Sequence, residues 1–138
     1  GAGDIVLFDE SGEVSVFARD GTALWTRPLR GRVRFAAPTY RDGFIYAGAH
    51  NKSLYALAVA DGKQAWTLKG PDKVSVGLIF AGTTLVACWD GGTITALSAD
   101  GARVKWEKNI GARVGGGSFI ATTEDGEIVR VNPASSMP

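Results

Sequence analysis

The stretch Asn51–Trp66, NKSLYALAVADGKQAW, contains an apolar segment, an Asp-Gly turn and a second segment that ends on tryptophan. The same pattern occurs at Glu13–Trp25 (EVSVFARDGTALW) and at Gly92–Trp106 (GTITALSADGARVKW), and a shortened copy begins at Glu127 (EIVRVNPAS). Trp25 and Trp66 are 41 residues apart, and Trp66 and Trp106 are 40 apart. The chain is therefore an internal repeat with a period of about 40 residues.

Each repeat is built from short apolar segments that are separated by turns. The second repeat predicts strands over residues 34–40, 44–48, 53–58 and 63–68, and the third predicts strands over 74–80, 84–89, 93–99 and 103–109. Asp-Gly pairs stand at 20–21, 42–43, 61–62, 90–91, 100–101 and 125–126, and we expect them to supply the positive φ angles of tight hairpins. Four short antiparallel strands in about 40 residues are typical of one β-propeller blade. We therefore predict an all-β fold made of propeller blades.

The two ends of the repeat are incomplete. We predict a partial blade 1 over residues 4–30, complete blades over 31–70 and 71–110, and a partial blade 4 over 111–134. The first unit begins with its second strand, and the last unit stops before a tryptophan strand. Because single-chain propellers close with about four to eight blades, we expect an incomplete ring. A longer chain, further copies of this chain or a partner protein would complete it through the open edges.

The composition limits the classes of partner. Of the 138 residues, 45% are apolar, which is enough for a core, and 15 basic against 14 acidic residues leave a formal charge of +1. Such a balance creates no general attraction to nucleic acid, and the basic segment RGRVR at 30–34 lacks interleaved aromatic residues. We expect no nucleic-acid partner. No apolar run of about 18 residues and no signal-peptide pattern is present, so we expect neither membrane insertion nor a targeting segment in these residues.

No recognisable catalytic or metal-binding motif accompanies the repeat. The single cysteine, Cys88, lies in an apolar run and is interpreted as a buried, inert residue. One Cys and one His do not make a standard zinc site. The glycines at 115–117 lack the Lys-Ser/Thr of a phosphate loop, and no Ser, His and Asp stand at a spacing that indicates a triad. We therefore expect no catalytic residue and no metal.

The second repeat carries a family resemblance. Leu54-Tyr55-Ala56-Leu57, followed by Asp61-Gly62-Lys63 and Trp66, resembles the tryptophan-docking repeat of PQQ-type β-propellers, whose consensus is close to YALDAxTGKxxW. The matches at 16–25 and 95–106 are weaker. In that family the Trp stacks on the neighbouring blade near its Gly turn. The resemblance thus implies a blade-docking role for Trp25, Trp66, Trp106, Gly21, Gly62 and Gly101.

Several functions are found on this repeat, so the resemblance leaves alternatives open. It occurs in quinoprotein dehydrogenases, in the outer-membrane assembly lipoprotein and in extracytoplasmic sensor domains. The dehydrogenases use a Ca²⁺ site of Glu, Asn and Asp, a catalytic Asp and a vicinal Cys pair over the quinone, and none of these is recognised here. We therefore expect a non-catalytic scaffold for protein or ligand recognition, with no bound PQQ. A dehydrogenase fragment, or a sensor or assembly-factor domain, is the alternative. The resemblance implies a periplasmic or extracellular location.

The propeller topology also predicts a binding face. If strands are lettered A to D outward, the D-to-A and B-to-C loops emerge at the same end of each blade, and loops carry most binding residues. We predict that this end binds through Arg32, Arg34, His50, Lys52, Lys73, Trp89, Asp90 and Arg113. Its cations would form a collar for an acidic peptide or an anionic ligand. The alternatives are a solvated rim without a ligand, and for His50 an ordinary surface residue.

Overall fold

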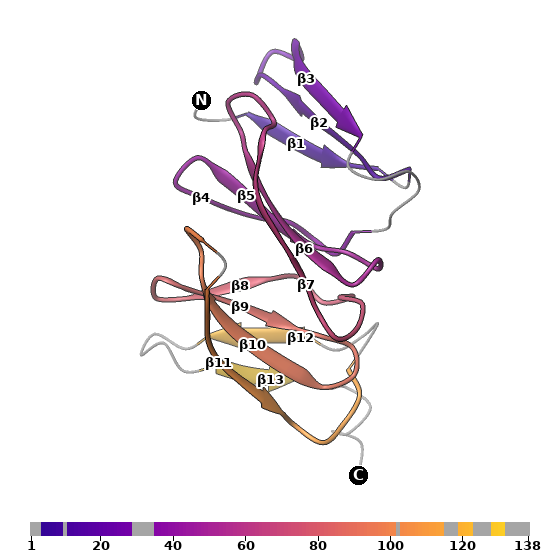
Figure 1. The fold of residues 1–138 in the computed structure, drawn as a ribbon. Coiled ribbons are helices and arrows are strands. Elements are labelled where there is room, and N and C mark those ends of the chain that lie inside the picture. The colour runs from indigo at the N-terminus through magenta and orange to yellow at the C-terminus, as the bar shows by residue number, and fades with distance from the viewer. Residues whose placement is uncertain are drawn as a thin grey trace.

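The computed structural model describes residues 4–9, 11–28, 35–101, 103–114, 119–122 and 128–131, and every element in these ranges is a strand or a turn. Successive antiparallel strands form four separate sheets, as Figure 1 shows. Blade 1 contains β1 (Ile5–Phe8), β2 (Glu13–Phe17) and β3 (Ala23–Pro28). Blade 2 contains β4 (Thr39–Arg41), β5 (Phe44–Gly48), β6 (Ser53–Ala58) and β7 (Gln64–Lys69).

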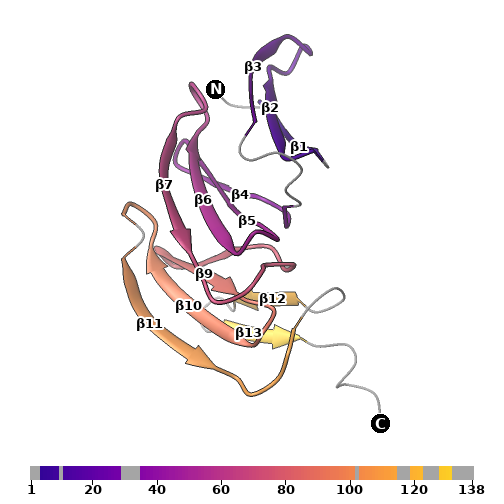
Figure 2. The same cartoon turned by 45° about the vertical axis from the view of Figure 1, so that its right-hand side comes forward.

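Blade 3 repeats the four-stranded arrangement of blade 2. It contains β8 (Ile79–Ala81), β9 (Thr84–Cys88), β10 (Thr93–Ser98) and β11 (Val104–Asn109). Blade 4 is described through the two strands β12 (Phe119–Thr122) and β13 (Ile128–Val131), and β12 lies against β8. The four sheets follow one another along an open arc, with blades 1 and 4 at opposite ends (Figures 1 and 2). The all-β prediction and the prediction of an unclosed set of propeller blades are confirmed.

Side chains that alternate along the strands form one buried layer between blades 2 and 3 and another between blades 1 and 2. Leu54, Ala56, Leu85, Ala87 and Leu97, with 0% of their surfaces exposed, belong to the largest core cluster, which joins blades 2 and 3. A smaller cluster joins blades 1 and 2 through Val16, Ile45 and Val59. The core therefore consists of layers between blades, and each blade is stabilised by its neighbours.

The innermost strands are shorter than predicted. The predicted strand at 34–40 is replaced by β4 and an isolated bridge between Phe35 and Ala49, and the predicted strand at 74–80 by β8. Pro38 has no N–H to donate to a ladder. The N–H groups of Val74 and Ser75 donate instead to the Ala49 carbonyl at 3.1 Å and to the Asp90 carboxylate at 3.0 Å. The N–H donors of this inner segment therefore find their acceptors in turns of both blades rather than in a neighbouring strand.

The Asp-Gly turns do not all have the predicted conformation. Gly21, Gly43 and Gly62 have φ angles of 90°, 85° and 73°. In the turn that contains Asp90 and Gly91 the positive φ falls on Gly92, at 101°, and Gly101 is not in the left-handed region. The prediction is therefore wrong for Gly91 and Gly101, and the pair at 125–126 lies outside the described residues. No helix occurs in the described ranges, so none that could cross a membrane was found there.

Candidate functional site

The blades dock through tryptophans that reach the next sheet. The Trp25 indole N–H donates to the Val59 carbonyl at 2.6 Å, and the Trp66 indole N–H donates to the Ala99 carbonyl at 2.7 Å. A Cβ at Gly62 would lie 2.8 Å from the Trp25 ring, so a glycine is needed where the ring packs on the turn. The same interaction is thus made twice between consecutive blades.

The other predicted docking residues lie differently. A Cβ at Gly21 or Gly101 would have nothing within 4 Å, and Trp106 has 43% of its surface exposed. In the outer turn of blade 3 the Ser98 N–H donates to the Arg103 carbonyl, and in that of blade 2 the Ala58 N–H donates to the Lys63 carbonyl. These equivalent bonds align Gly101 with Asp61 rather than with Gly62. The residue in the register of Gly62 is Ala102, which lies outside the described residues. The Asp-Gly pair of the third repeat is therefore shifted by one position.

The predicted binding face is assembled from B-to-C turns and inner segments. The Gly70 N–H donates to the Lys52 carbonyl at 2.8 Å, and the Asp90 N–H donates to the Lys73 carbonyl at 2.9 Å. These bonds bring the turns after β5 and β9 to the segment that follows β7. The structure thus places Lys52, Lys73 and Asp90 at one end of blades 2 and 3. Arg32 and Arg34 lie outside the described residues.

A buried carboxylate organises this end. Asp90 has 3% of its surface exposed, and it accepts hydrogen bonds from the Ser75 N–H at 3.0 Å and from the Ser75 hydroxyl at 2.7 Å. The His50 Nε2 atom lies 3.3 Å from the Ser75 oxygen. The Ser75 hydroxyl donates to Asp90, so its proton is directed away from His50. The arrangement stabilises the loop and differs from a nucleophile with a general base.

The cations at this end are not all free to attract an anion. Arg113 lies near the turn of Asp90, because the N–H of the next residue, Val114, donates to the Asp90 carbonyl at 2.8 Å. The Arg113 guanidinium lies 3.8 Å from the Asp72 carboxylate, and its side chain is 73% exposed. Such an exposed ion pair contributes little to stability. Asp72 offsets part of the positive charge that the predicted collar would present.

Trp89 lies beneath the surface instead of at the rim. It is 1% exposed, and its indole N–H donates to the Thr95 hydroxyl at 2.8 Å, which in turn donates to the Glu107 carboxylate at 3.0 Å. A side chain at Gly70 would overlap the Trp89 ring. Trp89 is therefore a packed core residue whose polar atom is satisfied. The sequence alone did not indicate Thr95 and Glu107, because the strand register decides that they meet Trp89.

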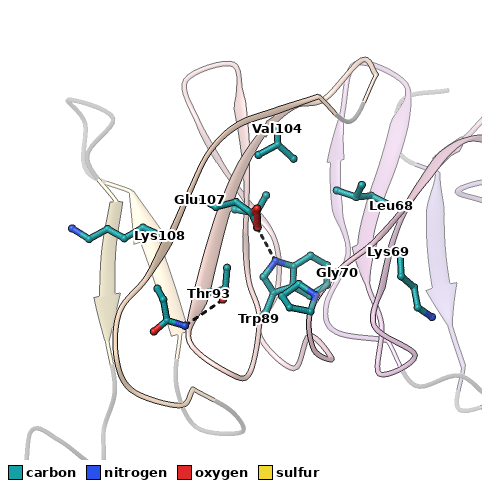
Figure 3. Close-up of a pocket in the computed structure, with 11 residues that line it drawn as sticks. Leu68, Lys69, Gly70, Trp89, Thr93, Val104, Glu107 and Lys108 are labelled. Carbon is teal, nitrogen blue, oxygen red and sulfur yellow. Dashed lines mark hydrogen bonds between the residues drawn. The ribbon is translucent and has the colours of Figure 1, made fainter.

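Above Trp89 runs a groove between the outer strands of blades 2 and 3. Its volume is about 520 Å³, and Leu68 and Lys69 of β7 face Val104, Glu107 and Lys108 of β11 across it. Figure 3 shows Trp89 between these two walls. The Glu107 carboxylate lies beside Trp89 in the groove, whereas the Lys69 and Lys108 ammonium groups point away from it (Figure 3), and the Lys69 ammonium donates to the Asn51 carbonyl at 3.1 Å.

The described residues contain neither a vicinal pair of thiols nor a cluster of metal-ligating side chains. Cys88, the single cysteine of the chain, is 2% exposed and packs with Val76, Val86 and Ile94, so a vicinal pair of thiols is not available over a ring. Within the described ranges, no group of three or more His, Cys, Asp or Glu side chains is placed to hold a metal ion.

Comparisons with known proteins agree with this architecture. A PQQ-repeat family model, described as "Outer membrane protein assembly factor BamB", matches residues 1–135. A protein named outer membrane protein assembly factor BamB, from Nitrosomonas eutropha, is 28% identical over 115 residues, which are 80% of this chain and 28% of that protein. The predicted resemblance to PQQ-type propellers is confirmed.

Solved structures show the same fold. BamB from Moraxella catarrhalis is similar with a TM-score of 0.79 and 17% identity, over 94% of this chain and 39% of that one. The WD40 β-propeller domain of Doa1 is similar with a TM-score of 0.79 and 13% identity, over 96% of this chain and 44% of that one. The chain thus spans less than half the length of each of these proteins.

Proposed function

Because the chain belongs to the family of outer membrane protein assembly factor BamB, we propose that it is a non-catalytic propeller scaffold that recognises other polypeptides. Relatives named as assembly factors support a role in building a larger complex. They also support a periplasmic location in a bacterium, which the resemblance already implied. Recognition would then use surfaces that the blades hold rigidly rather than a reaction centre.

One observation carries this proposal: an uncovered apolar face on blade 1. Ile5 and Leu7 on β1 are 53% and 52% exposed, and Leu24 on β3 is 50% exposed. Val6 and Phe8, which alternate with the first two, pack toward blade 2. The joint of blades 1 and 2 and the joint of blades 2 and 3 each bury such a layer, and burial of apolar surface contributes about 25 cal/mol per Å². A further polypeptide that covers this face would gain the same stabilisation.

The proposed cover is a further blade. A longer chain, a second copy or a partner protein can supply it, and each would continue the arc beyond blade 1. The geometry of the existing joints indicates what the cover would provide. A tryptophan on its outer strand would donate to the turn near Gly21, as Trp25 donates to the turn near Gly62.

Sedimentation at micromolar concentration tests the proposal. We expect a particle of more than one chain, and we expect Leu7→Glu to dissociate it because a carboxylate would be buried in the joint. Val104→Glu is the matched control, since Val104 is 48% exposed on β11 at another joint. A parent protein that sediments as one chain and unfolds cooperatively would contradict the proposal, as would equal dissociation by both variants.

The second candidate is a fragment of a PQQ-dependent dehydrogenase, which rests on the shared repeat. The buried position of Cys88 disfavours it. We expect no PQQ to remain bound after mixing and gel filtration. Quinone absorbance that elutes with the protein at a stoichiometric ratio would favour the dehydrogenase instead.

A further inference from the structure

A small aromatic pocket lies at the joint of blades 2 and 3, at the end opposite the predicted binding face. Its volume is about 290 Å³. Phe44, Tyr46 and Trp66 line it, and so do the carboxylates Asp42 and Asp100. Phe44 is 37% exposed, whereas Tyr46 is 5% exposed. The pocket therefore combines a buried aromatic wall with accessible acidic groups.

The three rings form a continuous surface. The ring centroids of Phe44 and Tyr46 are 6.4 Å apart, those of Tyr46 and Trp66 are 6.0 Å apart, and both pairs are tilted by 36°. The face of an aromatic ring carries partial negative charge and attracts a cation within about 6 Å of its centroid. Carboxylates beside such rings add a direct charge interaction. This combination selects a positively charged group with an apolar coat.

The repeat itself does not require this pocket. The bonds from the N–H groups of residues 9, 49 and 89 to the carbonyls of residues 13, 53 and 93 fix a 40-residue register between the blades. In that register Tyr46 corresponds to Val6 and to Val86. Val6 packs against Val16, Ile45 and Val59 at the joint of blades 1 and 2. A valine therefore suffices to close an inter-blade joint.

A second pair of positions differs between the two joints. Val59 and Ala99 are equivalent, because each carbonyl accepts the indole N–H of the preceding blade's tryptophan. Ala99 stands where the other joint has Val59, so two methyl groups are missing beside Trp66. The next residue is Asp100 in blade 3, whereas it is Ala60 in blade 2. These three substitutions, together with Phe44 where the register places Asp4, open a space, line it with further rings and add a carboxylate.

The protein already places one cation on an aromatic ring beside this pocket. The Arg41 guanidinium lies 4.7 Å from the centroid of Phe80 and donates to the Gly82 carbonyl. The Phe80 ring contacts Tyr46 edge-on at 5.5 Å. Burial raises the pKa of the Tyr46 hydroxyl, and Asp42 and Asp100 raise it further, while Arg41 partly opposes them. Both carboxylates therefore act electrostatically on the aromatic wall.

We propose that this pocket binds an alkylammonium group, with Phe44, Tyr46 and Trp66 against its carbon substituents and Asp42 and Asp100 neutralising its charge. The cation enters from the side of Phe44, the exposed ring. The Trp66 indole N–H stays bonded to the Ala99 carbonyl, so the bound group adds to the joint without opening it. This site is independent of the scaffold role and of the cover on blade 1.

A matched pair of ligands tests the charge requirement. Choline and 3,3-dimethylbutan-1-ol have the same shape. They differ in that choline has a positively charged quaternary nitrogen where the alcohol has a neutral quaternary carbon. We expect choline to shift the NMR resonance of the Trp66 indole N–H saturably, with an affinity about threefold to tenfold above that of the alcohol. The Trp25 indole N–H, at the closed joint, is the internal control and should not move. Equal affinities, or no shift up to about 100 mM, would overturn the proposal.

Variants of the pocket test its residues. Asp100→Asn and Phe44→Leu should each weaken choline at least about threefold, while Asp61→Asn, in the equivalent turn of blade 2, should leave the affinity unchanged. Unchanged melting temperatures show that the fold is retained. If neither pocket variant weakens choline, the assignment is wrong.

A further pair of probes distinguishes two sources of the same group. Binding of both n-butylammonium and N-acetyl-lysine methylamide indicates that a side chain of a polypeptide can enter. Binding of n-butylammonium alone indicates a free small amine. Either result supports an alkylammonium site, and binding of neither one contradicts it.

Discussion

At the scale of single residues, the joints depend on a tryptophan and on the turn that receives it. Trp25 bonds to the Val59 carbonyl and packs on Gly62, whose φ of 73° is in the left-handed region. Gly62 is therefore needed both for its backbone conformation and for the space it leaves. Lys52 shows that a residue with a side chain can adopt such an angle, with a φ of 68°.

Gly62→Ala and Gly101→Ala form a matched pair of substitutions. We expect Gly62→Ala to lower the free energy of unfolding by about 2 kcal/mol or more, because the left-handed conformation alone costs an L-residue about 1–2 kcal/mol and the Cβ also meets Trp25. Gly101→Ala should be neutral or stabilise by up to about 1 kcal/mol, since its conformation and surroundings accept a Cβ. Urea unfolding of both variants measures the difference, and similar losses would contradict it.

Tyr46 predicts a dependence of stability on alkaline pH. Its pKa is raised in the folded protein, chiefly by burial and further by Asp42 and Asp100. The folded state thus holds the phenolic proton more tightly than the unfolded state. The resulting stabilisation is fully present below the unfolded pKa of about 10, and it is lost as pH rises through the folded pKa. Unfolding free energies measured upward from about pH 9 should fall more steeply for the parent than for Tyr46→Phe.

At the scale of elements, the innermost segment of blade 3 is held by the turns of blades 2 and 3 rather than by a strand ladder. The Val74 N–H donates to the Ala49 carbonyl, and both the N–H and the hydroxyl of Ser75 donate to Asp90. A backbone N–H that is withdrawn from water must find a partner. Asp90 therefore fixes the path of the segment that leads from β7 to β8.

Asp90→Ala should lower the free energy of unfolding by about 1–3 kcal/mol, because it leaves the Ser75 donors without an acceptor in a buried site. Ser75→Ala should cost less, since the N–H keeps its bond to Asp90. Asp100→Ala, an exposed carboxylate, is the control and should change stability by less than about 0.5 kcal/mol. Thermal or urea unfolding separates the three, and an Asp90→Ala variant as stable as the control would contradict this role.

At the scale of the whole molecule, the described blades are joined by buried layers between neighbours along the arc. Stability in such an array is approximately a sum of terms for single repeats and for neighbouring pairs. The cluster that joins blades 2 and 3 is the largest, and Trp66 packs against it. Loss of this one interface would divide the arc in its middle.

Trp66→Ala should accordingly destabilise the protein by about 3–5 kcal/mol, as large aromatic truncations in cores do. Because blades 1 and 2 would lose their connection to blade 3, we expect the single unfolding transition to broaden or to split in two. Trp106→Ala, whose side chain is 43% exposed, is the matched control and should have a smaller effect. Calorimetry measures both, and an unchanged melting profile for Trp66→Ala would show that this tryptophan does not join the blades.

The repeat of Asn51–Trp66 determines that the chain forms propeller blades, and it places the three outer strands of blades 2 and 3 to within one residue at each end, because strand alternation and glycine turns are local properties. Tertiary structure decides the rest. Contacts between blades shorten the inner strands and bury Trp89, and the hydrogen bonds of the third outer turn shift Gly101 by one register position. The pocket of Phe44, Tyr46 and Asp100 likewise joins residues about 55 positions apart in the chain. No local pattern encodes such a meeting, because it depends on how two sheets are packed against each other.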